Sequence, residues 1–352
     1  MRFLIAKAFC FGSLAVLMSC RPQVAYYSAG DFEKVPKIDV HFHYLTMDDQ
    51  YIKFAISENF RLLTPIWEGD VPIDAQFKVS SSIRQSYPDN YAFFAAFPTD
   101  SFNNAGFAEK TIEHFRKSLQ TGATGIKIWK NIGMVLKDTS GHYVMIDDPA
   151  FEPVFAYLEQ NKIPVMGHLG EPKDCWLPAN EMIDPGAVSY FKENPKYYMF
   201  LHPEAPSYNE QIDARDTVLK RHPKLDFLGA HLASLEWSVD ELAKRLDRYP
   251  NLKVDMAARM YPIQYQSKID REKVRDFMIR YQERILYGTD FEVHDDPALN
   301  GDSVRAHLHK GWLDQWIYMT TDSTIAVKGL KLPKQVIDKI YYKNAEKYFR
   351  KI

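Results

Sequence analysis

One stretch near the N-terminus decides how the chain folds: Lys37-Ile38-Asp39-Val40-His41-Phe42-His43. It predicts a short strand that ends in two histidines separated by one residue. Side chains alternate across a strand, so Asp39, His41 and His43 are expected on one face and apolar side chains on the other. Two imidazoles on one face of a strand can bind a single metal ion. A lone His-x-His is weak evidence, so its weight depends on what the other strands carry.

From Lys37 onward, apolar strand-like runs alternate with helical patterns, and no break marks a second domain. Strands are predicted over Lys37–Val40, Arg61–Ile66, Tyr91–Phe97, Gly125–Trp129, Ile163–Gly167, Leu225–Ala230, Leu252–Met256 and Ile285–Thr289. Eight such strands with helices between them predict a single-domain α/β protein, a (β/α)8 barrel over residues 37–352. A doubly wound open sheet would need a glycine-rich loop after its first strand, where this chain has histidines.

Helices are predicted over Phe107–Leu119, Asp148–Gln160, Glu210–Arg221, Leu235–Arg248, Arg271–Gln282, Val304–Tyr318 and Lys334–Arg350. The segment near residues 175–209 breaks this rhythm, because it holds several prolines and tyrosines and little periodicity. A long irregular segment inside a compact domain is usually a functional loop or lid.

The composition describes an ordinary globular protein of 352 residues, with a net charge of -2 and 46% hydrophobic residues. Near-neutral charge gives no argument for nucleic acid as a partner. The expected partner is a small-molecule substrate, and the oligomeric state is left open.

The N-terminus reads as a targeting segment outside the fold. Arg2 and Lys7 precede an apolar run, Phe9 to Met18, and Ser19-Cys20 follows. This pattern resembles a bacterial lipoprotein signal over residues 1–19, in which Cys20 is lipidated and becomes the new N-terminus. Residues 20–36 would then be a tether to a lipid anchor in the cell envelope, the only expected membrane contact. The alternative is an ordinary signal peptide with an incidental cysteine.

Ligand-type side chains stand at the ends of five predicted strands, where barrels of this kind build their active sites. They are His41 and His43, Lys127, His168, His231 and Asp290. Each has a plain structural reading alone: a strand-end histidine can be hydrogen-bonded, Asp290 can cap a turn, and Lys127 can form an ion pair. Together, at the same end of one barrel, they indicate a metal site.

With these residues in place, the chain resembles the amidohydrolase superfamily, in the branch that holds metal-dependent hydrolases and non-oxidative decarboxylases. The resemblance runs from His41-Phe42-His43 to the closing stretch 339–345. It implies metal ligands at His41, His43, His168 and Asp290, and a second-metal or proton-shuttling role for His231. In two-metal members a carboxylated lysine bridges both ions, and Lys127 falls at that place. The implied cofactor is one or two divalent ions, zinc first, with manganese or another ion as alternatives.

The implied chemistry assigns catalytic roles to Asp290, His231 and Lys127. Zn²⁺ held by imidazoles and a carboxylate lowers the pKa of a coordinated water to about 7. Asp290 would take the proton and pass it to the leaving group, while His231 or Lys127 polarises the substrate carbonyl.

Four further residues are expected to contact substrate: Arg259, Glu171, Trp176 and Glu236. Arg259 could fork onto a carboxylate, and Glu171 could instead support His168. The leading function is hydrolysis of a small amide, lactone or ester. The alternatives are decarboxylation of a small aromatic or unsaturated carboxylic acid, and a non-catalytic lipoprotein that binds a metal or solute.

Overall fold

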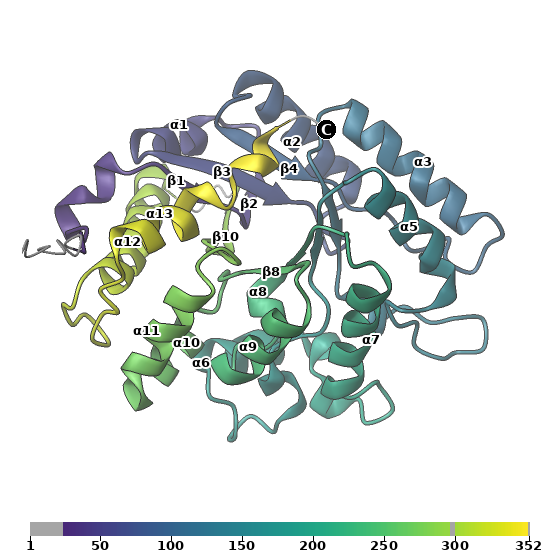
Figure 1. Ribbon diagram of the computed structural model, residues 1–352. Coiled ribbons are helices and arrows are strands. Elements are labelled where there is room, and N and C mark those ends of the chain that lie inside the picture. The colour runs from purple at the N-terminus through teal and green to yellow at the C-terminus, as the bar shows by residue number, and fades with distance from the viewer. Residues whose placement is uncertain (1–23, 296–299, 351–352) are drawn as a thin grey trace, which may run out of the picture.

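The computed structural model describes residues 24–295 and 300–350 (Figure 1). The predicted signal and the predicted lipidation site Cys20 lie outside these residues. The described part of the predicted tether, residues 24–36, includes the short 3-10 helix η1 (Ala29–Lys34). Phe32 and Val35 are buried in the main core, so the packed domain extends N-terminal to Lys37.

Eight parallel strands form the barrel wall. They are β1 (Lys37–Asp39), β3 (Phe60–Pro65), β4 (Tyr91–Phe94), β5 (Ile126–Ile128), β6 (Val165–Gly167), β7 (Phe227–Gly229), β8 (Leu252–Asp255) and β9 (Ile285–Leu286). A bridge between Ala95 and Ile126 joins β4 to β5. The Val40 amide donates to the Tyr287 carbonyl over 3.0 Å and joins β9 to β1. All eight strands overlap the predicted ones, and the (β/α)8 prediction is confirmed.

Helices surround the strands on the outside (Figure 1). The longer ones are α1 (Gln50–Ser57), α2 (Ile73–Ser86), α3 (Phe107–Gln120), α5 (Glu152–Gln160), α7 (Tyr208–Arg221), α9 (Val239–Arg248), α10 (Met260–Ile269), α11 (Arg271–Arg280) and α12 (Gly301–Thr320). The sequence reading missed α1, α2 and α10. None of the described helices is both long and apolar enough to cross a membrane.

The predicted closing helix is wrong as a single element. It divides into α13 (Lys334–Asp338), a π-helical turn η6 (Lys339–Lys343) and a 3-10 turn η7 (Glu346–Phe349). The Asn344 side chain donates to the carbonyls of Gln282 and Ile285 over 2.7 and 2.8 Å. These bonds tie the chain to the start of β9, and the last turn then packs into the barrel interior through Tyr348 and Phe349.

A bend separates the two parts of the opening stretch. β1 ends at Asp39, and a second strand, β2 (Phe42–Leu45), pairs in parallel with β10 (Phe291–His294). Because the alternation breaks at this bend, Asp39 does not share a face with the histidines. Its carboxylate instead accepts from Thr289 Oγ1 over 2.5 Å and from Trp312 Nε1 over 3.2 Å.

The irregular segment is partly helical and lies over the C-terminal ends of the strands. It holds η3 (Lys173–Trp176), α6 (Pro185–Glu193), η4 (Pro195–Tyr197) and η5 (Met199–Leu201). Two short elements, α4 (Asn131–Met134) and α8 (Ala230–Ala233), follow β5 and β7 at the same end, and η2 (Pro149–Phe151) precedes α5. The segment, taken from here on as residues 173–207, forms a wall around the mouth of the barrel.

Candidate metal centre and pocket

Three donor atoms from the stretches that follow β1 and β9 converge at the mouth of the barrel. The Oδ1 atom of Asp290 lies 3.3 Å from His41 Nε2 and 3.1 Å from His43 Nε2. All three residues offer ligand atoms within 4.8 Å of one another. Gly288 makes room for this contact, because a Cβ there would lie 3.1 Å from His41 Cβ. Two imidazole nitrogens and one carboxylate oxygen are a donor set that suits a divalent transition metal.

Hydrogen bonds at Nδ1 orient the rings of His41 and His231. Nδ1 of His41 lies 3.0 Å from Asp255 Oδ2, and Nδ1 of His231 lies 2.9 Å from the Ala257 carbonyl. A carbonyl or carboxylate can only accept, so each Nδ1 carries the hydrogen and each Nε2 keeps a lone pair. The second oxygen of Asp255 accepts from the His231 amide over 2.7 Å. One buried carboxylate thus fixes two site histidines, as is usual for ligands of protein-bound metals.

Burial sets the charge state of this cluster. Desolvation holds the pKa values of His41, His168 and His231 well below the usual value for histidine, so their imidazoles are neutral, as a metal ligand requires. Burial alone would raise the pKa of Asp290, but the hydrogen bond from His43 Nε2 favours the carboxylate, and the pKa lies well below its usual range. Asp290 is therefore ionised.

Lys127 lies beneath the donor set. Its ammonium is fully buried, 3.5 Å from His41 Nε2 and 3.4 Å from Met166 Sδ. Burial lowers the pKa of Lys127 to about 8. The structure thus brings Lys127 into contact with the centre, as its predicted role requires.

The backbone is strained where two strands deliver their side chains. Four successive residues, His231 to Ser234, have φ between 55° and 57°, and Asp290 has φ 67°. Such left-handed conformations are costly for residues other than glycine and cluster at functional sites. The amide hydrogen bond from His231 to Asp255 and the one from Asp290 to the His41 carbonyl, 2.7 Å, hold them in place.

His168 lies on the far side of His231, with the two ring centroids 4.3 Å apart. Its Nε2 faces Glu171 Oε2 over 3.3 Å, and its buried Nδ1 has no hydrogen-bond partner among the described residues. His168 is outside the groups whose ligand atoms lie within 4.8 Å of one another. It borders the centre through His231.

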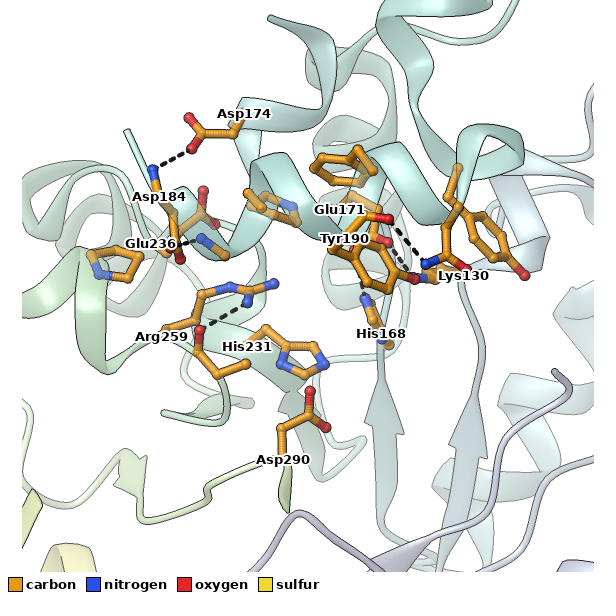
Figure 2. A pocket seen from close by; sticks show the side chains of 18 of the residues that line it. Lys130, His168, Glu171, Asp174, Asp184, Tyr190, His231, Glu236, Arg259 and Asp290 are labelled. Atoms are coloured by element: carbon orange, nitrogen blue, oxygen red, sulfur yellow. Dashed lines mark hydrogen bonds and ion pairs between the residues drawn. The ribbon is translucent and has the colours of Figure 1, made fainter. Parts of the chain in front are cut away.

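A cavity of about 470 Å³ opens above these residues (Figure 2). Asp290, His231 and His168 face it from the strand ends. Its aromatic lining comes from several loops and from the 173–207 segment: Trp67, Trp129, Tyr190, Phe191, Tyr197, Trp237 and Tyr265. A cavity of this size holds a small molecule rather than a polymer.

Arg259 and Glu236 line the cavity on the side away from His168 (Figure 2). The Nε atom of Arg259 and the Oε2 atom of Glu236 are buried with no hydrogen-bond partner among the described residues. The other Glu236 oxygen accepts from the Lys173 amide over 2.9 Å. Burial raises the pKa of Glu236 to about 7, against the charge of Arg259. Both residues line the cavity and have unused hydrogen-bonding capacity, and their substrate contacts stay a prediction.

Trp176 is placed otherwise than predicted. It is absent from the cavity lining, because its indole N–H donates to the Pro206 carbonyl over 3.2 Å and its ring packs on Tyr208. The sequence reading also missed Asp255, Lys130 and Tyr190. Only Asp255 could have been found from the sequence, because it is an acidic residue at the end of a predicted strand. Asp290 was found by the same signal.

The amidohydrolase family model matches residues 84–351 of this sequence. That span is most of the chain and includes the ends of six of the eight barrel strands. The chain belongs to the amidohydrolase family. No curated protein matches it significantly.

Solved structures similar to this amidohydrolase share its fold at low sequence identity. An uncharacterised TIM-barrel protein from Bordetella bronchiseptica is 16% identical, with a TM-score of 0.53 over 90% of this chain and all of the other. 2,6-Dihydroxybenzoate decarboxylase from Rhizobium is 15% identical, with a TM-score of 0.51 over 90% of this chain and 98% of the other. A protein described as amidohydrolase II is 17% identical, with a TM-score of 0.52.

Amidohydrolases depend on divalent metal ions, and the residues present fit such an ion. His41 and His231 keep lone pairs on the Nε2 atoms, because a fixed acceptor takes each Nδ1 hydrogen. Nδ1 of His168 is buried as well and has no hydrogen-bond partner among the described residues, so it is a further nitrogen that could bind a metal ion. Several lone pairs facing one anionic carboxylate form an arrangement that a cation completes.

Proposed function

We propose that this amidohydrolase is a metal-dependent hydrolase of a small amide, lactone or ester. The convergence of His41 Nε2, His43 Nε2 and Asp290 Oδ1 carries the proposal. Zinc is the ion we favour, because the donor set is two imidazoles and one carboxylate. When bound, the ion would supply Lewis acidity to the reacting water and carbonyl.

The protein's own groups divide the remaining work. Asp290 is ionised and its side chain is 30% exposed to the cavity, so its carboxylate can accept the proton from the attacking water and return it to the leaving group. His231 holds its Nε2 lone pair toward the site and can accept a hydrogen bond there. The buried Lys127 ammonium offsets negative charge that develops above it.

Decarboxylation of a small aromatic or unsaturated carboxylic acid is the second candidate. The side of the cavity that holds Arg259 favours it. Arg259 is 8% exposed and forms no ion pair with any described residue, so a substrate carboxylate is a fitting counter-ion. The aromatic lining would stack on a planar ring. Release of carbon dioxide without consumption of water would identify this reaction.

We propose in addition that the enzyme acts while anchored by lipid in the bacterial cell envelope. The support is the N-terminal sequence pattern that ends at Cys20. Radiolabelled palmitate should be incorporated into the wild-type protein in cells and not into the Cys20→Ser variant. Equal labelling of both would overturn the anchor.

Metal content tests the proposed chemistry most directly. The mature protein, purified without chelator or added metal, should contain close to one equivalent of zinc per chain. Two equivalents would indicate that Lys127 is carboxylated and bridges both ions. No metal, with none taken up from zinc or manganese solutions, would overturn the proposal and favour a non-catalytic binding protein. For a protein that does contain metal, a panel of amides, lactones, esters and carboxylic acids would identify the reaction.

A further inference from the structure

A chain of polar contacts connects the helical wall of the cavity to His168, and all of its members except Tyr190 are buried (Figure 2). The hydroxyl of Tyr190, on α6, lies 2.6 Å from Lys130 Nζ. The same ammonium contacts Glu171 Oε1. The other oxygen of Glu171 lies 3.3 Å from His168 Nε2. Residues from three different parts of the sequence therefore form one continuous path.

This chain fixes where the hydrogen of His168 must be. Glu171 and Lys130 are 3% and 2% exposed and form an ion pair, so Glu171 is a carboxylate that only accepts hydrogen bonds. Nε2 of His168 must then carry the hydrogen. The lone pair is left on Nδ1, which is buried and has no partner in the described protein.

Lys130 is itself held rigidly. Its ammonium lies 4.3 to 4.9 Å from the ring centroids of Trp129, Tyr190 and Tyr197. Two of these rings belong to the wall, since Tyr190 is on α6 and Tyr197 is in η4. A buried ammonium with one carboxylate, one hydroxyl and three aromatic faces around it has little freedom to move.

We propose that Glu171 is the positioning carboxylate of His168, and that Lys130 and Tyr190 couple its placement to the docking of α6. Through this chain His168 presents Nδ1 to the divalent ion of the proposed function, on which the inference rests. Undocking of α6 would release Tyr190, loosen Lys130 and Glu171, and weaken the hold of His168 on the ion. The wall that shapes the cavity thereby also tunes the metal centre.

Two measurements test this inference without any substrate. The first is the tautomer of His168 in the metal-free wild-type protein, read from long-range ¹H–¹⁵N correlations of ¹⁵N-histidine-labelled protein. We expect the Nε2–H form. The Nδ1–H form would overturn the inference, and this readout holds even if the protein binds no metal and the proposed function fails.

The second measurement is zinc affinity, by competition with a chromophoric chelator. Glu171→Gln should weaken zinc binding roughly 10- to 100-fold, the usual effect of losing an outer partner of a metal ligand. Glu236→Gln is the matched control, because it removes an equally buried cavity carboxylate that contacts none of the site histidines; it should leave zinc affinity unchanged. Equal affinities for the two variants would overturn the inference, while the proposed function would stand.

Tyr190→Phe keeps the ring on α6 and removes only the hydroxyl, so it remains informative if Glu171→Gln fails to fold. We expect zinc affinity to fall by about two- to fivefold, the cost of one hydrogen bond transmitted through Lys130. An unchanged affinity would show that α6 and the metal centre are independent, and would overturn the coupling.

Discussion

The floor and the wall of the cavity are built in different ways. On the floor, strand ends supply His41, His231 and Asp290, and fixed partners hold the Nδ1 atoms of the two histidines and the backbone amides of His231 and Asp290. The wall is a separate segment of the chain over residues 173–207, and its outer apolar side chains include Phe200 and Leu201, which are 48% and 53% exposed. The floor holds the groups proposed to react, and the wall reaches it through the contacts that run from Tyr190 to His168.

Asp290→Asn should have the largest effect of any single change. Asparagine tolerates the left-handed backbone at this position, so the variant should fold, but it loses the negative charge and the proton acceptor. Turnover of whichever substrate the panel identifies should fall by about 10³-fold or more. Unchanged thermal unfolding would be the control for folding. Full activity in the variant would remove Asp290 from the mechanism.

Asp255→Asn tests whether the carboxylate that holds His41 in place affects the affinity for zinc. It should weaken zinc binding roughly 10- to 100-fold, because an amide is a poorer acceptor for the His41 Nδ1–H group. The measurement is the chelator competition described above.

Asp174→Asn is the matched control in the wall. Asp174 is also buried and also accepts from two backbone amides, those of Ile183 and Asp184 over 2.9 and 3.0 Å, but it contacts no histidine. It should lower stability without changing zinc affinity. A similar loss of zinc affinity in both variants would show that buried carboxylates of the floor and of the wall affect the metal centre equally.

The same contrast separates what could be predicted from sequence and what could not. Eight strands were predictable because buried parallel strands are short apolar runs, and the strand ends locate His41, His168 and Asp290 at one rim. The bend after Asp39 was not predictable, because alternation along a strand gives no warning of where pairing shifts to a new partner. β2 and β10 pair only once the barrel is closed.

The contacts of the wall depend on distant parts of the chain, and no local pattern encodes them. Lys130 and Tyr190 are 60 residues apart, and each alone reads as an ordinary surface residue. Trp176 is an error of the other kind, because the sequence pattern assigned it a role in the cavity that it does not have. An aromatic residue at the start of an irregular segment was expected in the cavity, but the fold of that segment turns its indole to Pro206 and Tyr208.

Glu236→Gln should change how stability depends on pH, to a moderate extent. The pKa of Glu236 is raised from 4.5 to about 7 in the folded protein, so between these values the folded state binds more protons than the unfolded state. Its contribution to stability is therefore fully present below pH 4.5 and is lost as the pH rises through 7. The variant lacks this titration.

Urea unfolding of the metal-free wild type and variant should show this directly. The stability of the wild type relative to the variant should fall between pH 5 and pH 8, by on the order of 1–3 kcal/mol. A difference that grows over this range would mean that Glu236 is stabilised as a carboxylate in the fold, and that Arg259 outweighs burial.

Asp70→Asn should have the smallest effect, although it breaks a link between the wall and the rest of the barrel. Asp70 lies 3.1 Å from Lys196, but the two side chains are 86% and 52% exposed, and water screens such pairs. We expect the free energy of unfolding to change by less than about 0.5 kcal/mol and zinc affinity to stay the same. The contact of Tyr190 with Lys130 should account for the docking of the wall instead, because the Lys130 ammonium is only 2% exposed. If Asp70→Asn weakened zinc binding as much as Tyr190→Phe, docking of the wall would depend on its exposed rim as much as on the contact between Tyr190 and Lys130.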